Sequence, residues 1–497
     1  MLQSINNIIS NYKKNLISIE EVIHTLDTNN FTQEEIKESG IIYTPMYISD
    51  YIVKKLSPEL NETVFEPSFG HGIFIFSLLE YIQDRFTLSS DKLKDYFLSN
   101  VYGQDIQINN LSEFKELVIA YFDKKGTVLK EGDICNFTIS DTLINTSNHY
   151  DIIIGNPPYV RIKNLDKEYI EFLRKNYNSC KNGNIDLYYA FIEYAHLYSN
   201  RSGMITPNSW LYNSSAKNLR TDVKDNVAAI IDFKQIQIFK NVSVYTSIFF
   251  INNTNDIKKI MTYKENLKKK NWKLIEKNTL DNTRWSFAEQ DKVKHDFKII
   301  KYHTPIATLR DKIYITDEIK GKDTISFYKV SKIKVIEDFK NNKKQIIMPY
   351  KIIDNKYVIK KEEELSKDTL NYLLKNKEEL LKRDKGKTAK YESWFAYGRK
   401  QGLNIYQENS YLIPIPGMLK DTQTFFAISI NKLEAPFLFS SGFLLEVTSD
   451  DKDKILKYLN SAKFKKIIKS EGKVWKGKTI DSSYYSLSMT QLKSYLK

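Results

Sequence analysis

Cysteine, histidine and long apolar runs are scarce in this sequence of 497 residues. Its only cysteines, Cys135 and Cys180, allow at most one disulfide, and two lone cysteines are usually inert packing residues. No apolar stretch approaches the roughly 20 residues that cross a bilayer, and residues 1–30 are too polar and interrupted for a signal peptide. The six histidines lack the spacing of a metal site. These absences predict a cytoplasmic globular protein with no membrane partner and no metal.

Acidic residues are comparatively few in the second half of the chain. Residues 1–250 contain 24 lysines and arginines and 30 acidic residues, whereas residues 251–497 contain 51 and 31. The net charge therefore changes from −6 to +20 within a chain whose total is +14. A basic half that is also rich in aromatic residues is typical of a protein that binds a polyanion with stackable bases, although AT-rich coding also enriches lysine.

The length of the chain and its 41% of hydrophobic residues predict two or three domains. Residues 1–38 are expected to form a short helical extension. Expected strands and helices alternate over residues 39–255, which predicts an α/β domain. Residues 256–295, rich in lysine and asparagine, are expected to be a linker. Residues 296–497 are expected to form a second domain of mixed α+β structure.

The most informative stretch is the decapeptide 151–160, DIIIGNPPYV. Its run of isoleucines predicts a buried parallel strand, and the two prolines that follow cannot extend a sheet because they lack an N–H group. The side-chain oxygen of Asn156 and the carbonyl of Pro157 can accept two N–H bonds, while Tyr159 can stack on a ring. This set suits a flat molecule that carries an NH2 group.

Three earlier strands are also expected to end in functional side chains. A glycine-rich turn, Glu66–Gly72 (EPSFGHG), opens a helix and lets a ligand approach the backbone at the helix N-terminus. Asp105 ends the second expected strand and Asp133 the third. Because ligands bind at the carboxyl ends of strands in open α/β sheets, this clustering predicts a doubly wound, Rossmann-like domain with its site at that edge.

The second domain contains an expected charged helix, 362–381, that is followed by a strongly basic run. Most charge runs are only solvated faces. This run leads into aromatic residues, and such an interleaving of cations with rings is typical of nucleic-acid surfaces. The residues expected to contact a nucleic acid are Lys382, Arg383, Lys385, Lys387, Trp394, Tyr397 and Arg399.

Several motifs, taken in their order along the chain, resemble those of the gamma class of N6-adenine DNA methyltransferases from bacterial restriction-modification systems. They are Gly40–Pro45, Glu66–Gly72, Asp105, Asp133 and Asn156–Tyr159. The resemblance covers residues 38–255, and residues 372–402 resemble the C-terminal target-recognition domain of that family. It implies a Rossmann-like methyltransferase domain that uses S-adenosylmethionine, followed by a DNA-recognition domain.

The resemblance also implies a set of cofactor-binding residues. They are Thr44, Glu66, Pro67, Gly70, Gly72, Asp105, Ile106, Asp133, Ile134 and Asn156. Thr44 would hold the methionine end of S-adenosylmethionine, Asp105 the ribose, and Asp133 with Ile134 the adenine. The family usually has an aromatic residue in the place of Ile134, so apolar contact would replace ring stacking there.

The same resemblance implies a reaction at N6 of an adenine that is rotated out of the duplex. Asn156 and Pro157 would accept the two hydrogens of N6 and aim its lone pair at the methyl group. Tyr159 would stack on one face of the base. Phe239, or alternatively Tyr245, would stack on the other face.

The implied function is site-specific methylation of adenine in double-stranded DNA, which would protect host DNA. The protein is expected to be a monomer, associated with the nucleoid when bound, beside a separate cognate restriction endonuclease. Two alternatives are an RNA or protein-glutamine methyltransferase, whose substrates also present a planar NH2 group, and a catalytically silent DNA-binding specificity protein with the same scaffold.

Overall fold

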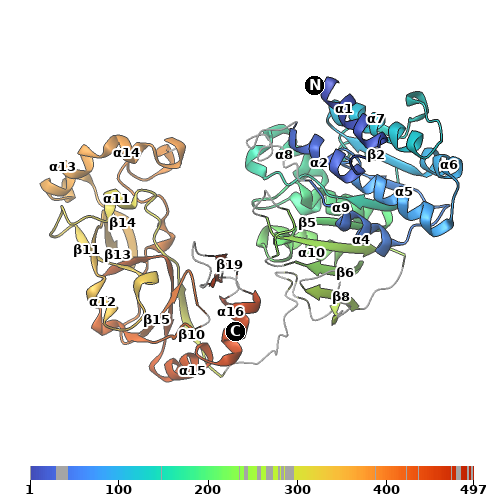
Figure 1. Ribbon diagram of the computed structural model, residues 1–497. Coiled ribbons are helices and arrows are strands. Elements are labelled where there is room, and N and C mark those ends of the chain that lie inside the picture. Colours follow the sequence, from blue (N-terminus) through green and yellow to red (C-terminus); the bar gives the residue numbers. More distant parts are fainter. Residues whose placement is uncertain are drawn as a thin grey trace. The chain divides into compact units, whose positions relative to one another are not determined.

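The structure is a computed structural model that divides into two compact units, Met1–Phe287 and Ala288–Lys497. In Figure 1 the first unit is coloured from blue to green and the second from yellow to red. The described residues are 2–29, 43–146, 148–233, 236–239, 244–254, 259–264, 273–277, 280, 282, 285, 296–386, 388–420, 422–434, 436–471, 473–476, 483–487, 489, 492–493 and 496.

A nine-stranded sheet forms the centre of the first unit (Figure 1), with the strand order β3-β2-β1-β4-β5-β7-β6-β8-β9. The strands are β1 (Val64–Glu66), β2 (Val101–Asp105), β3 (Phe137–Ile139), β4 (Tyr150–Gly155), β5 (Ser199–Pro207), β6 (Val227–Asp232), β7 (Thr246–Asn252), β8 (Lys259–Lys264) and β9 (Lys273–Glu276). Strands β1 to β5 pair in parallel, whereas β7 runs antiparallel to both β5 and β6. The predicted doubly wound α/β fold is therefore confirmed.

Helices cover both faces of this sheet. They are α1 (Leu2–Lys13), α2 (Ile19–Asn29), α4 (Met46–Leu56), α5 (Ile73–Phe86), α6 (Ser90–Asn100), α7 (Ile108–Lys124), α8 (Lys167–Asn176), α9 (Tyr188–Leu197) and α10 (Lys217–Val223). Successive residues of a strand point to opposite faces, so Ile152 and Ile154 pack in the core with α1 to α7, and Ile153 packs in the core with α8 to α10. A strand that is buried on both faces explains the uninterrupted isoleucines of β4.

The third strand lies later in the chain than the sequence suggests. Asp133 does not end a strand, because residues Glu131–Asp133 form a 3-10 turn, and β3 begins at Phe137. The buried ring of Phe137 packs against Phe69, Phe97 and Phe114, which fixes this short edge strand. The polar sequence around Asp133 has no such apolar anchor.

Part of the segment expected as a linker, 256–295, is built into the sheet instead. Strands β8 and β9 extend the sheet beyond β6. Further along, Trp285 is fully buried and packs edge to face against Trp210. A lysine-rich strand suits the edge of a sheet, because its charges discourage pairing with other chains.

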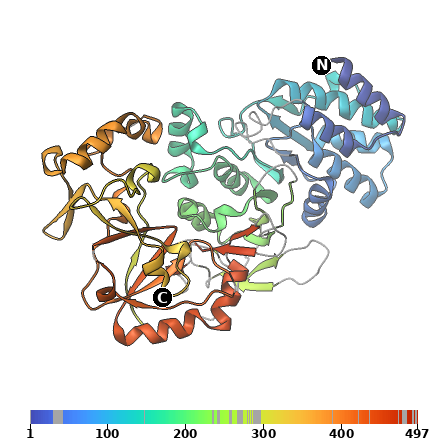
Figure 2. The ribbon, with the colours of Figure 1, turned by 60° about the vertical axis from the view of Figure 1, so that its left-hand side comes forward.

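The second unit has mixed α+β structure, as expected (Figure 2). Its strands are β10 (Ile299–His303), β11 (Thr324–Lys329), β12 (Lys344–Ile347), β13 (Tyr350–Ile353), β14 (Lys356–Ile359), β15 (Tyr411–Pro416), β16 (Ile428–Ser429), β17 (Phe437–Ser440), β18 (Gly442–Val447), β19 (Lys473–Lys476) and β20 (Ser483–Ser486). Its helices are α11 (Asp311–Tyr314), α12 (Asp338–Asn341), α13 (Lys367–Lys375), α14 (Lys377–Leu381), α15 (Ser449–Leu459) and α16 (Ala462–Glu471). The single helix expected over 362–381 is thus interrupted at Asn376, which caps α13. Within the described part of the chain, no helix is both long and apolar enough to cross a membrane.

Candidate cofactor and substrate site

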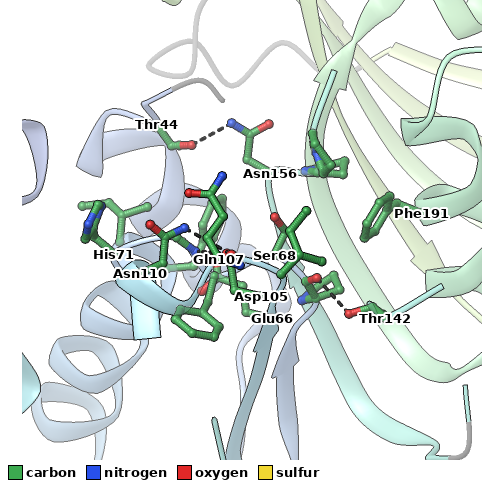
Figure 3. Close-up of a pocket in the computed structure, with 18 of the residues that line it drawn as sticks. Thr44, Glu66, Ser68, His71, Asp105, Gln107, Asn110, Thr142, Asn156 and Phe191 are labelled. Atoms are coloured by element: carbon green, nitrogen blue, oxygen red, sulfur yellow. Dashed lines mark hydrogen bonds between the residues drawn. The ribbon is translucent and has the colours of Figure 1, made fainter. Parts of the chain in front are cut away.

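A cavity opens at the carboxyl ends of four neighbouring strands of the first unit, β1 to β4 (Figure 3). The lining residues that come from these strand ends are Glu66, Pro67, Ser68, Phe69, Gly70, His71, Asp105, Ile106, Gln107, Ser140, Asp141, Thr142, Asn156, Pro157 and Pro158. Its empty space, counted together with the solvent at its open mouth, is about 1010 Å³. The edge of the sheet that the sequence indicated is therefore hollow.

The glycine-rich turn after β1 forms the floor of the cavity. Glu66 is only 2% exposed, and its Oε2 atom has no hydrogen-bond partner among the described residues. Burial, and then the charge of Asp105, hold the pKa of Glu66 well above its ordinary value. At Gly72 the backbone has φ = 81°, and a Cβ atom would lie 2.5 Å from the ring of Phe114. Only glycine fits this close approach of the turn to α7.

Asp105, at the end of β2, holds the turn in place. Its carboxylate accepts hydrogen bonds from the backbone N–H of Gly70 at 3.0 Å and of Gln107 at 2.8 Å, and from Nδ2 of Asn110 at 3.2 Å. Burial raises the pKa of Asp105, and these donors oppose the rise. A carboxylate has about four acceptor positions, so one remains for a ligand hydroxyl.

Asn156 and Pro157 follow β4 at the mouth of the cavity. Nδ2 of Asn156 donates to Oγ1 of Thr44 at 3.0 Å, as Figure 3 shows. This bond orients the amide and leaves Oδ1 as its acceptor atom. Of the expected motif Gly40–Pro45, residues 40–42 lie outside the described residues, while Thr44 is buried and lines the cavity.

Of the two candidate stacking residues, Phe239 lies beside Tyr159. Their ring centroids are 6.4 Å apart and the rings are tilted by 59°. The hydroxyl of Tyr159 donates to the carbonyl of Ile205 at 3.2 Å, which fixes one ring at the end of β5. Tyr245 is half-buried, and its carbonyl accepts from the N–H of Asn208. Of the two candidates, the structure thus brings the ring of Phe239 next to that of Tyr159.

Asp133 and Ile134 are not among the residues that line the cavity. Asp133 is exposed and accepts a bond from the N–H of Lys130, while Ile134 is buried in the core. Ser140, Asp141 and Thr142, which follow β3, line the cavity instead. Sequence reasoning missed Asp141, although it comes two residues after Ile139, the last residue of the alternating segment Phe137–Ile139.

The basic run of the second unit is also arranged differently from the expectation. The Arg383 side chain is completely buried and donates to backbone carbonyls, including those of Leu380 at 2.7 Å and Trp394 at 2.5 Å. Tyr397 is 2% exposed, and its hydroxyl donates to the carbonyl of Ile347. Both side chains are therefore buried and bonded within the fold. The prediction that they contact DNA is wrong.

The other residues predicted to contact DNA either bond to acidic side chains or lie outside the residues that the structure describes. Lys382 pairs with Glu379 at 2.6 Å, and Arg399 pairs with Asp384 at 2.9 Å. Nε1 of Trp394 donates to Glu362 at 2.7 Å. Lys387 and the side chain of Lys385 lie outside the described residues.

His71 gained no role from the sequence, yet it lies between two carboxylates. Its Nδ1 atom is 2.5 Å from Asp27 on α2, and its Nε2 atom is 2.7 Å from Glu113 on α7. Burial lowers the pKa of His71, but the bonds to both carboxylates outweigh burial and raise it to about 9. The imidazole is therefore charged at neutral pH. No sequence pattern indicates this cluster, because its members are far apart in the chain.

Several known proteins are similar in sequence to the first unit. Residues 73–239 match the Eco57I restriction-modification methylase family. The Type II methyltransferase M.BanIII of Aneurinibacillus aneurinilyticus is 28% identical over 233 residues, which cover 43% of this chain and 38% of that protein. M.BstVI of Geobacillus stearothermophilus is 26% identical over 258 residues, which cover 46% and 45%. The matched region thus spans less than half of these relatives.

Solved structures share the fold. The Type IIL restriction-modification enzyme MmeI, solved in complex with DNA, aligns with a TM-score of 0.60 and 13% identity over 95% of this chain and 70% of that one. The complex of DrdV with DNA aligns with a TM-score of 0.54 and 12% identity over 89% and 54%. Residues 73–239 are thus similar to the Eco57I restriction-modification methylase family, and the fold of the chain is that of MmeI and DrdV.

Proposed function

We propose that the protein transfers a methyl group from S-adenosylmethionine to N6 of an adenine in double-stranded DNA. The observation that carries this proposal is that Asn156 and Pro157 line the cavity, while Tyr159 of the same tetrapeptide lies beside Phe239. The methylase family and the DNA complexes of MmeI and DrdV support the reaction class and the substrate.

S-adenosylmethionine supplies an electrophilic methyl group when bound, and several residues that line the cavity suit its functional groups. The unpartnered Oε2 of Glu66 suits the ammonium group of the methionine end. The remaining acceptor position of Asp105 suits a ribose hydroxyl. We assign the adenine to Asp141 and Thr142, with Ile106 as an apolar wall, because these residues line the cavity where Asp133 and Ile134 do not.

The target base must leave the duplex, since N6 is not accessible to a buried group inside the helix. Rotation of the base costs a few kcal/mol, and stacking between Tyr159 and Phe239 offsets about 1–3 kcal/mol of this cost. For a base to enter, the tilted ring of Phe239 must turn parallel to that of Tyr159.

Asn156 and Pro157 then act on the reacting nitrogen. The lone pair of N6 is delocalised into the adenine ring, so N6 is a poor nucleophile. Acceptance of its two hydrogens by Oδ1 of Asn156 and by the Pro157 carbonyl pulls N6 toward tetrahedral geometry and aims its lone pair at the methyl group. The bond from Asn156 to Thr44 keeps the amide in the orientation that this step requires.

We assign DNA contacts in the second unit to a groove lined by Lys301, Lys356 and Lys400. All three are exposed, and Tyr357 and Tyr406 add aromatic walls. Neither Lys301 nor Lys356 forms an ion pair with a described acidic residue, whereas Lys400 pairs with Glu392. We also propose that the protein acts as a monomer beside a separate restriction endonuclease.

Analysis of labelled products tests the proposal. Incubation with methyl-labelled S-adenosylmethionine and duplex DNA, followed by digestion to nucleosides, should place the label in N6-methyldeoxyadenosine. Asn156→Ala should reduce the transfer rate by about 100-fold or more, because a transition-state acceptor is lost, and should leave cofactor affinity within about threefold. Label in RNA or in protein would contradict the proposal, as would full turnover by Asn156→Ala.

A further inference from the structure

Helix α2 forms part of the cavity wall, although it precedes every motif of the methylase family. Ile23 and Asp27 line the cavity, and they lie one turn apart on the same face of α2. The neighbouring residues Val22 and Leu26 are buried in the core of the first unit. The helix is therefore packed into the domain and is not a loose extension.

Polar bonds attach both ends of α2 to segments that border the cavity. In its first turn, Oε1 of Glu20 accepts from the hydroxyl of Tyr43 at 2.8 Å and from the N–H of Met46 at 2.9 Å. In its last turn, Oδ1 of Asp27 bonds to Nδ1 of His71. The helix thus connects the segment around Thr44 with the glycine-rich turn.

The charges around Asp27 favour a cationic ligand. A single imidazolium, His71, lies between the carboxylates of Asp27 and Glu113, so the trio carries one net negative charge near neutral pH. The second oxygen of Asp27 has no hydrogen-bond partner within the described part of the chain. Since both nitrogens of His71 are engaged, the imidazole itself is not available to a ligand.

The position of the trio indicates which end of the cofactor it faces. In Figure 3, His71 lies on the same side of the cavity as Thr44, and Thr142 lies on the opposite side. Thr142 and Asp141 form the proposed adenine end. The side of His71 and Asp27 is therefore left for the methionine end, which carries an ammonium group.

We propose that the Asp27 carboxylate accepts a hydrogen bond from the α-ammonium group of the bound cofactor. His71, held by Glu113 from the other side, fixes the orientation of Asp27. This inference rests on the proposed use of S-adenosylmethionine, and it makes α2 a component of the cofactor site that lies outside the family match.

Two ligands that differ at the amino-acid end test the inference by calorimetry. S-adenosylhomocysteine carries the α-ammonium group, whereas 5′-methylthioadenosine lacks the amino-acid end. Asp27→Asn keeps the shape of the side chain and its bond to His71 but removes the charge. This variant should lower the affinity for S-adenosylhomocysteine by about tenfold or more. It should change the affinity for 5′-methylthioadenosine by less than about twofold.

Glu113→Gln is the matched control, because Glu113 bonds to the same imidazole but does not line the cavity. It should change the ratio of the two affinities much less than Asp27→Asn does, because it acts on Asp27 only through His71. This ratio is insensitive to a general loss of folded protein. If Asp27→Asn lowers the affinity for both ligands equally, the inference is wrong, but the proposed function is not affected. Failure of the unaltered protein to bind either ligand would overturn the proposed function together with the inference.

Discussion

Glu66 has a buried carboxyl group whose ionisation opposes folding and favours a cationic ligand. Because its pKa is raised in the folded state, the folded protein binds more protons at Glu66 than the unfolded chain does. This group therefore lowers the stability of the ligand-free protein as pH rises above the ordinary carboxyl pKa. An ammonium group beside Oε2 would offset that cost, since it favours the charged form.

Cofactor affinity should consequently rise as the pH rises above the ordinary carboxyl range and Glu66 loses its proton. Glu66→Gln should bind S-adenosylhomocysteine about 10- to 100-fold more weakly at pH 8 and with little dependence on pH. The same variant, free of ligand, should melt at a higher temperature than the unaltered protein at pH 8. Calorimetry and thermal unfolding at several pH values measure both effects. An affinity of Glu66→Gln that still rises with pH would contradict the assignment.

Some of the side chains that line the cavity could be predicted from the sequence to converge. Glu66, Asp105 and Asn156 follow strands with strong apolar patterns, so their convergence at one edge of the sheet could be predicted. Asp141 was missed because β3 has only three residues, and its short pattern competes with the conspicuous Gly132–Asp133 turn. The His71 trio could not be predicted, because it depends on how α2 and α7 pack.

At the scale of elements, the turn between β1 and α5 depends on Gly72. Its positive φ costs about 1–2 kcal/mol for a residue with a side chain, and displacement of the Phe114 ring adds about 1–3 kcal/mol. Gly72→Ala should therefore lower the melting temperature of the first unit by roughly 5 °C or more. Scanning calorimetry measures this change.

Gly132→Ala is the matched control for that substitution. A Cβ atom at Gly132 has no neighbour within 4 Å, and its backbone φ is not in the left-handed region. This variant should melt within about 1 °C of the unaltered protein. Equal stability of the two variants would show that the turn adapts to a side chain.

Elements with a strong periodic pattern were predictable, and those that depend on tertiary packing were not. Strand β4 and helices α5 and α8 follow from apolar spacing. Strands β8 and β9 did not, because edge strands tolerate lysine and asparagine and so read as a linker. The break between α13 and α14 leaves no signal stronger than Asn376, a residue that also occurs within helices.

At the scale of the whole molecule, the basic second half does not present all of its charge to a partner. The Arg383 side chain donates hydrogen bonds to backbone carbonyl groups, and Lys382 and Arg399 form ion pairs with acidic side chains. The cations that remain accessible include Lys301 and Lys356 in the groove of the second unit. Composition could predict that a basic surface exists, but only the fold shows which residues form it.

Substitution of both Lys301 and Lys356 by glutamine should weaken DNA binding and reduce the slope of log K against log salt by about 2, since each phosphate contact contributes about 0.9. Fluorescence anisotropy at several salt concentrations measures the slope. Lys382→Gln is the control, because the ion pair with Glu379 already neutralises this charge, and its slope should change by less than about 0.5. If the slope is the same in all variants, Lys301 and Lys356 do not contact DNA and the DNA-binding surface lies elsewhere.

The hydrogen bond between Asn156 and Thr44 joins residues 112 positions apart in the chain. It also joins the proposed cofactor site to the proposed base site, because Thr44 belongs to one and Asn156 to the other. A cofactor that engages Thr44 changes the environment of the amide that receives the base, and the base has the same effect in return. The two sites should therefore be coupled, so that each ligand changes the affinity of the protein for the other.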